Sequence, residues 1–227
     1  MKLITVAGPP SSGKTSVLTK VIEFIKKEYQ VGVIKFDCLA TTDDVIYEEQ
    51  KIPVKVGLSG NLCPDHFFVT NIEDGVSWGI REGFDYLLTE SAGLCNRCSP
   101  HIKGVYAVCV IDNLSGVNTP KKIGPMLMYA DLVVITKSDI VSQAEREVFA
   151  YQVRQANKKA KIIHVNGITG QGSLELSKML QEASDIETVS NKRLRFTMPA
   201  ALCSYCLGER EIGKDFQVGN VKTMSWT

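Results

Sequence analysis

Eight residues near the start of the chain, Gly8-Pro9-Pro10-Ser11-Ser12-Gly13-Lys14-Thr15, match the pattern G-x-x-x-x-G-K-[ST] of a phosphate-binding loop. Backbone N–H groups of such a loop surround phosphates, and the helix that follows adds the positive end of its dipole. The lysine bridges the terminal phosphates, and the threonine hydroxyl suits Mg²⁺. The segment predicts a site for a nucleoside triphosphate with magnesium. The residues expected to bind it are Gly8, Ser11, Ser12, Gly13, Lys14, Thr15 and Ser16.

Two acidic residues follow strand-like apolar runs: Asp37 comes after residues 31–36, and Glu90 comes after residues 84–89. In a parallel sheet the carboxyl ends of the strands lie above the phosphate site. We therefore expect both acids to join Thr15 around Mg²⁺ and water, and to form the catalytic set together with Lys14. Each acid alone could also be an ordinary exposed carboxylate at a strand end. Asp43 and Asp44 are weaker companions.

A second strand-like run, residues 132–136, leads into Thr136-Lys137-Ser138-Asp139. An aspartate here can accept the two N–H groups on the edge of guanine, which adenine does not offer, while the lysine stem lies over the ring. The pattern favours GTP over ATP, although it could also be a solvated turn. Thr136, Lys137 and Asp139 are therefore expected at the base, with backbone N–H groups from the loop that starts at Gly167.

Cysteine and histidine residues gather at spacings that suit metal binding. The chain has seven cysteines, and two C-x-x-C pairs are more than random placement predicts. Two thiolates and an imidazole can hold Zn²⁺ or Ni²⁺, and a twofold dimer could pool two such sets. The candidate ligands are Cys63, His66, Cys95, Cys98, His101, Cys203 and Cys206.

Other interpretations of these ligands stay open at this point. Cys95 and Cys98 could be thiols packed in a turn or ligands of a structural zinc, and Cys63 with His66 could be a packed thiol and an exposed imidazole. Cys203 with Cys206 could be half of a zinc knuckle or two ligands of an iron–sulfur cluster.

Composition restricts the partners and the compartment. The 227 residues carry 26 basic and 25 acidic side chains, for a formal charge of +1, which argues against nucleic acid binding by electrostatics alone. The apolar start, residues 3–7, is too short for a signal peptide or a membrane anchor, and no later run reaches the roughly 18 apolar residues of a membrane helix. We expect a cytoplasmic protein without a membrane partner, whose cysteines stay reduced.

Apolar runs of strand length alternate with helix-like stretches, which predicts an α/β domain with a doubly wound, mostly parallel sheet of the P-loop NTPase type. Strands are expected at residues 3–7, 31–36, 52–56, 84–89, 105–111, 132–136 and 162–165. Helices are expected at residues 15–28, 69–82, 141–159 and 173–183. The pattern breaks after Ser184, so we predict a GTPase domain at 1–184 and a small extension with two cysteines at 185–227.

Several segments in order resemble the nickel-insertion GTPases HypB and UreG, within the dimerising class that includes signal-recognition GTPases. Besides the phosphate loop these are 52–57 leading to Cys63-Pro64-Asp65-His66, then Glu90-Ser91-Ala92-Gly93, 110–112, 120–125 and 130–139. The resemblance covers about residues 1–184. The family usually has asparagine where Thr136 stands, and the urease-type pattern is Cys-Pro-His, into which Asp65 is inserted here. No lysine precedes Lys14 in the loop, unlike the nitrogenase-iron-protein branch.

The resemblance implies a slow GTPase that delivers nickel to a client metalloenzyme, acts as a homodimer and meets the client's accessory proteins. In this class the Glu90–Gly93 segment senses the γ-phosphate, which adds Gly93 to the nucleotide-binding residues, and Cys95 and Cys98 follow at once. If the segment moves when GTP is cleaved, the ligand geometry changes and metal is released. The alternatives are a nucleotide-switched iron–sulfur cluster carrier or electron-transfer NTPase with a cluster that bridges a dimer, and a regulatory binding module without catalysis.

Overall fold

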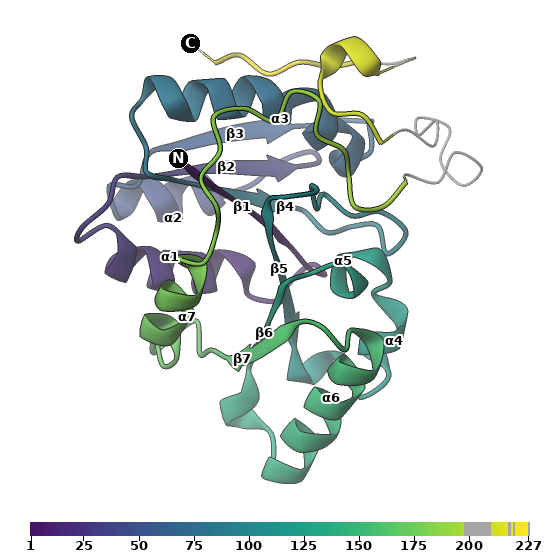
Figure 1. Cartoon of the computed structure of the whole chain (residues 1–227). Coiled ribbons are helices and arrows are strands. Elements are labelled where there is room, and N and C mark those ends of the chain that lie inside the picture. The colour runs from purple at the N-terminus through teal and green to yellow at the C-terminus, as the bar shows by residue number, and fades with distance from the viewer. Residues whose placement is uncertain (198–209, 218, 220, 227) are drawn as a thin grey trace.

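The computed structural model describes residues 1–197, 210–217, 219 and 221–226. In this part of the chain seven strands form one sheet in the order β3-β2-β4-β1-β5-β6-β7, and every neighbouring pair is parallel (Figure 1). The predicted doubly wound α/β fold is confirmed. The strands are β1 (Lys2–Ala7), β2 (Val31–Asp37), β3 (Val54–Leu58), β4 (Tyr86–Ser91), β5 (Tyr106–Asp112), β6 (Leu132–Thr136) and β7 (Lys161–His164).

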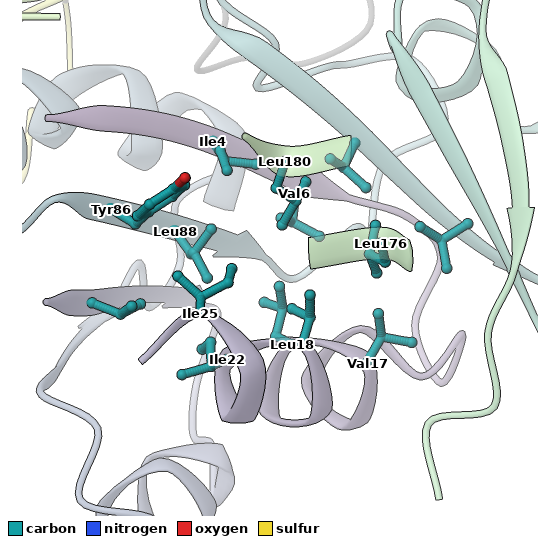
Figure 2. Packing of buried hydrophobic residues seen from close by; sticks show 14 of the residues in the cluster. Ile4, Val6, Val17, Leu18, Ile22, Ile25, Tyr86, Leu88, Leu176 and Leu180 are labelled. Carbon is teal, nitrogen blue, oxygen red and sulfur yellow. The ribbon is translucent and has the colours of Figure 1, made fainter. Parts of the chain in front are cut away.

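Helices cover both faces of this sheet, which explains why its central strands are apolar on both sides. On one face α1 and α7 pack against β1 and β4, and Figure 2 shows Leu18, Leu176 and Leu180 pointing toward Ile4 and Val6. The opposite face is covered by α3, α5 and α6 in two further clusters of buried side chains. The helices are α1 (Lys14–Ile25), α2 (Asp43–Glu49), α3 (Pro64–Arg81), α4 (Thr119–Lys122), α5 (Pro125–Met128), α6 (Gln143–Ala156) and α7 (Ser173–Leu180).

The four predicted helices are present, and the largest difference is the start of α3. This helix begins at Pro64, five residues before the predicted start at Val69, because proline is favoured in the first turn, where its missing N–H is not needed. Cys63 is consequently the N-cap, and Asp65 and His66 lie in the first turn. The short helices α2, α4 and α5 lack a periodic apolar face and were not predicted. Among the described helices none is long and apolar enough to cross a membrane.

The described part of the extension packs on the α3 face of the sheet. Ile186, Val189, Leu194 and Ile212 belong to the same buried cluster as the apolar side of α3. Figure 1 shows the C-terminal segment running along α3. The boundary at 184 stays a prediction, but the described residues beyond it share a core with the sheet.

Two polar contacts tie the extension down. The Arg195 guanidinium donates to both carboxylate oxygens of Asp131, at 2.8 and 2.6 Å, and to the carbonyl oxygens of three residues. Near the C-terminus, the Asn71 side chain donates to the carbonyl of Lys222 at 3.0 Å and accepts from the N–H of Met224 at 2.7 Å. Cys203 and Cys206 lie between these contacts in sequence and outside the described residues.

The loop after β4 touches the loop after β1. Gly93 has a φ of +71°, and a Cβ there would lie 1.7 Å from the carbonyl oxygen of Gly8. A side chain at Gly8 would in turn lie 2.0 Å from the carbonyl oxygen of Val110. Only glycine permits this approach of two backbones. The phosphate loop and the segment that follows Glu90 are therefore in direct contact.

Substitution of this glycine tests the contact. Gly93→Ala and Gly83→Ala both place alanine at a positive φ, of +71° and +74°, which costs about 1 kcal/mol in either case. Gly83 meets no described atom within 4 Å, whereas Gly93→Ala must displace the Gly8 carbonyl. We expect Gly93→Ala to lower the free energy of unfolding by about 2 kcal/mol more than Gly83→Ala, as measured by urea denaturation. Equal losses would show that the two loops do not touch.

Candidate functional site

The phosphate loop connects β1 to α1 and curves around one end of a cavity. Ser11 and Gly13 have φ values of +59° and +88°, a curvature that turns successive N–H groups toward a common point. The Lys14 ammonium donates to the carbonyl oxygens of Gly8, at 3.0 Å, and Pro9, at 2.9 Å. Burial lowers the pKa of Lys14. The cavity has a volume of about 510 Å³, and its lining includes this loop, Asp37 and Glu90.

Glu90 is the centre of the polar contacts at this cavity. It is the penultimate residue of β4 and is only 1% exposed. Its Oε1 accepts from the Thr15 hydroxyl at 2.8 Å and from the Lys35 ammonium at 2.7 Å, and its Oε2 accepts from the Tyr47 hydroxyl at 2.7 Å. The predicted neighbours Thr15 and Glu90 are thus brought together, and both oxygens of the carboxylate are engaged.

Lys35 and Tyr47 are the site residues that the sequence analysis missed. Lys35 is 3% exposed and also forms ion pairs with Asp43 at 2.5 Å and Asp37 at 3.8 Å. Burial alone would lower the pKa of Lys35, but Glu90 and Asp43 outweigh it and raise that pKa. Burial, and then the Glu90 carboxylate, raise the pKa of Tyr47 well above its ordinary value, so the phenol remains a donor.

Oxygen atoms that suit Mg²⁺ collect in the same cavity. Thr15, Asp37, Asp43 and Glu90 all line it. Hydroxyl and carboxylate oxygens are ligands that Mg²⁺ takes together with nucleotide phosphates. The N–H of the following residue donates to Asp37 Oδ1 at 2.8 Å, which fixes this carboxylate at the end of β2. The donor set fits a magnesium ion bound with phosphates, with the Lys35 ammonium among the same oxygens.

A second cavity, of about 200 Å³, adjoins the phosphate loop and is lined by Lys137, Asp139, Asn166, Gly167 and Ile168. Its lining holds the predicted guanine-binding residues Lys137, Asp139 and Gly167. The Lys137 ammonium donates to the carbonyl of Ser11 at 2.9 Å. The Thr136 hydroxyl donates to the carbonyl of Ser12 at 2.6 Å, so Thr136 helps to fix the conformation of the phosphate loop. Thr136, which stands where the family usually has asparagine, thus forms a hydrogen bond to this loop.

A thiol group, defined here as Cys63, Asp65 and Cys98, lies at the start of α3 and in the turn after β4. One ligand atom from each residue lies within 4.8 Å of the others. Asp65 is 2% exposed, and burial, followed by the neighbouring Cys63, raises the pKa of its carboxyl to about 8. Its Oδ1 has no hydrogen-bond partner among the described residues. Two thiols and a carboxyl form a donor set for a transition metal.

Two further predicted ligands, His66 and Cys95, are described but are not members of the thiol group. His66 is buried in the first turn of α3, and neither ring nitrogen has a hydrogen-bond partner in the described part of the chain. Cys95 is a half-buried thiol at the start of the turn that ends at Cys98. Asp65, which interrupts the Cys-Pro-His pattern, is the residue that the structure places beside Cys63. The signal in the sequence that could have identified Asp65 was its position two residues after Cys63, the N-cap of α3.

His101 differs from its predicted role as a metal ligand. It is 0% exposed, and its ring nitrogens lie 3.0 Å from the Thr5 hydroxyl and 3.0 Å from the carbonyl oxygen of Met126. Both ring nitrogens are therefore used within the core, and neither is available to a metal in this arrangement. Burial lowers the pKa of His101 to about 4.

The phosphate cavity and the thiol group are joined by one short stretch of chain. β4 ends with Glu90 and Ser91, the next loop contacts Gly8 through Gly93, and the turn that holds Cys98 follows. On its other side this turn packs closely on α5, since a Cβ at Gly124 would lie 2.5 Å from the carbonyl oxygen of Asn96. Glu90 and Gly93 are thus a few residues from Cys98 in sequence, and this segment packs against the phosphate loop on one side and the start of α5 on the other.

The parallel sheet, the loop between β1 and α1, and the acids at the strand ends define a P-loop nucleotide-binding protein. Residues 2–164 match the family model described as CobW/HypB/UreG, nucleotide-binding domain, so the chain belongs to this family. The resemblance to HypB and UreG is confirmed.

Three comparisons show which proteins the chain is similar to. It is 50% identical over 220 residues to uncharacterized protein MJ0120 of Methanocaldococcus jannaschii, covering 96% of this chain and 94% of that protein. It is 29% identical to the urease accessory protein UreG of Aliarcobacter butzleri, covering 70% of this chain and 86% of UreG. The structure of HypB from Helicobacter pylori in complex with nickel has a TM-score of 0.65 at 20% identity, covering 80% and 86% of the chains, a likeness in fold.

The structural role of His101 predicts a specific pH dependence. Its pKa is about 4 in the folded protein and about 6.5 when unfolded, so the unfolded state binds more protons between these values. Its contribution to stability is present above pH 6.5 and is lost as the pH falls toward 4. Between pH 7 and 5 this loss is about 2 kcal/mol. We expect urea denaturation of His101→Gln to show a pH dependence smaller by that amount. Parallel profiles for both proteins would contradict the structural role.

Proposed function

We propose that this chain is a GTP-hydrolysing metallochaperone that carries nickel to a client metalloenzyme and releases it according to the nucleotide state. The observation that carries the proposal is the thiol group, whose Cys98 lies on the short segment that leads from Glu90 at the phosphate cavity. A nucleotide site alone would not require two thiols and a buried carboxyl at this place.

The nucleotide part of the proposal assigns a role to each contact. The phosphate loop from Gly8 to Ser16 binds the phosphates, and Lys14 bridges the terminal ones. Thr15 and Asp37 supply Mg²⁺ with oxygens, and the ion, when bound, offsets charge on the phosphates. Glu90 accepts a hydrogen bond from the Thr15 hydroxyl, and we assign it to position Thr15 and to join Thr15 and Asp37 around Mg²⁺ and water. Hydrolysis is slow without a further positioning group.

Guanine recognition belongs to the second cavity. There Asp139 accepts the two N–H groups of guanine, the stem of Lys137 covers the ring, and the Gly167 backbone lies beside the base. The support is that these residues line one cavity next to the phosphate loop. Thr136 acts indirectly, by holding the Ser12 carbonyl.

The cargo part of the proposal assigns Cys63 and Cys98 as thiolate ligands and Asp65 as an oxygen ligand. Sulfur and oxygen donors of this kind accept either Ni²⁺ or Zn²⁺. Nickel is supported by the relatives, one of which is a urease accessory protein and another a HypB in complex with nickel. His66 is an additional candidate, since its ring is buried in the same helical turn as Asp65.

Three ligand atoms leave a transition metal with further positions to fill. A second copy of the chain, or the client and its accessory proteins, would supply the rest, so the proposal includes a homodimer and transfer within the cytoplasm. An iron–sulfur cluster requires four thiolates in the usual case, and only two occur in the thiol group. That alternative depends on Cys203 and Cys206, which lie outside the described residues.

Substitution of single thiols tests the cargo site. We expect Cys63→Ser and Cys98→Ser each to weaken Ni²⁺ binding at least about tenfold, because a hydroxyl replaces a thiolate ligand. Cys38→Ser is the matched control: its half-buried thiol donates to the Gly60 carbonyl at 3.2 Å and is not part of the thiol group. Affinities come from competition with a coloured chelator under anaerobic conditions. Unchanged affinity in both variants, or an equal loss in the control, would contradict the site.

A further inference from the structure

Lys35 is an unusual residue for the middle of a buried parallel strand. Lysine is almost never fully buried unless it is paired, because removal of its charge from water is costly. On β2 its neighbours Ile34 and Phe36 are apolar and fully buried. The Lys35 ammonium compensates for this burial with three carboxylates, at 2.7 Å from Glu90, 2.5 Å from Asp43 and 3.8 Å from Asp37.

The Lys35 ammonium lies among the protein oxygens that would bind the Mg²⁺ ion of a nucleotide complex. The same Glu90 oxygen, Oε1, accepts from both Lys35 and the Thr15 hydroxyl. Lys35 also lines the 510 Å³ cavity together with Lys14 and the three acids. The protein therefore places a fixed positive charge of its own beside the magnesium position.

The charge balance in the cavity depends on this residue. Asp37, Asp43 and Glu90 contribute three negative charges, and the lysines of the lining, Lys14, Lys35 and Lys137, contribute three positive ones. Without Lys35 the carboxylates would repel a polyphosphate and attract a divalent cation more strongly. With Lys35 present, both tendencies are reduced.

We propose that the Lys35 ammonium acts as a counter-cation within the protein and sets the magnesium dependence of nucleotide binding. It permits nucleotide to bind without Mg²⁺, and it lowers the affinity of the protein–nucleotide complex for Mg²⁺. The inference rests on the nucleotide part of the proposed function and not on the cargo part. Lys35 acts through the charge of the cavity and determines how strongly nucleotide binding depends on Mg²⁺.

The same ammonium fixes the wall of the cavity. Asp43 is the first residue of α2, and Tyr47 on this helix donates to Glu90 Oε2 at 2.7 Å. Lys35 and Glu90 thus hold α2 through two contacts. A purely structural role for Lys35 would act through this wall and would affect every nucleotide complex alike, which the experiment must separate from the effect of charge.

The test measures binding of a fluorescent GDP over a series of Mg²⁺ concentrations, starting from EDTA, in buffers of constant ionic strength without transition metals. In Lys35→Met we expect affinity in EDTA to fall about tenfold, while the Mg²⁺ concentration that half-restores binding also falls about tenfold. Lys35→Arg keeps the charge and should follow the wild type. The control Lys20→Met removes a half-buried lysine that pairs with Glu23, outside the lining of the cavity, and should change neither quantity.

A weaker affinity for GDP in EDTA together with a stronger response to Mg²⁺ distinguishes an effect of charge from an effect of structure. Equal loss of affinity with and without Mg²⁺, an unchanged Mg²⁺ midpoint, or an arginine variant that behaves like methionine would overturn the proposal. If Lys35→Met does not fold, Lys35→Gln, which removes the charge but keeps a hydrogen-bond donor toward Glu90, decides. Its affinity in EDTA and its Mg²⁺ midpoint should both fall about tenfold, and an unchanged midpoint would overturn the proposal. Since no transition metal is present, failure of the cargo site leaves the result unaffected.

Discussion

The buried carboxylate of Glu90 is the charge on which the arrangement of the site depends. A carboxylate without partners costs several kcal/mol when it is buried, so each of its oxygens must accept hydrogen bonds. The donors are Thr15 from α1, Lys35 from β2 and Tyr47 from α2. Three elements that are separate in sequence are therefore held in one geometry by one group. That geometry places the threonine hydroxyl, the acids at the strand ends and the phosphate loop around the same cavity.

The position of Glu90 in the chain extends this constraint to the thiols. The residues after it leave the sheet, pass Gly8 so closely that Gly93 admits no side chain, and form the turn that carries Cys98. Cys63 and Asp65 reach the same place from the N-terminus of α3. The phosphate loop is thus in direct contact with the segment of chain that leads to Cys98. We propose that the contact between Gly93 and Gly8 is the physical basis for coupling between nucleotide and metal.

The fold was largely predictable from the sequence, whereas the contacts of Glu90 with Lys35 and Tyr47 were not. Apolar runs predicted the strands because both faces of a parallel sheet are covered, and the phosphate loop was evident from its spacing. Lys35 and Tyr47 were missed because their partner, Glu90, lies more than 40 residues away, and a lone lysine in a strand usually faces solvent. His101 follows a cysteine pair in sequence, but its ring is buried among core partners. Asp65 was treated as an interruption of a pattern because the early start of α3 was not foreseen.

The coupling between the two sites is tested most directly by the Ni²⁺ affinity of the unaltered protein in two nucleotide states. Titrations would follow the thiolate-to-nickel absorption with a competing chelator, once with GDP and Mg²⁺ and once with a non-hydrolysable GTP analogue and Mg²⁺. The account predicts affinities that differ at least about fivefold, which corresponds to about 1 kcal/mol of coupling free energy. Equal affinities in the two states, with both nucleotides bound, would contradict it.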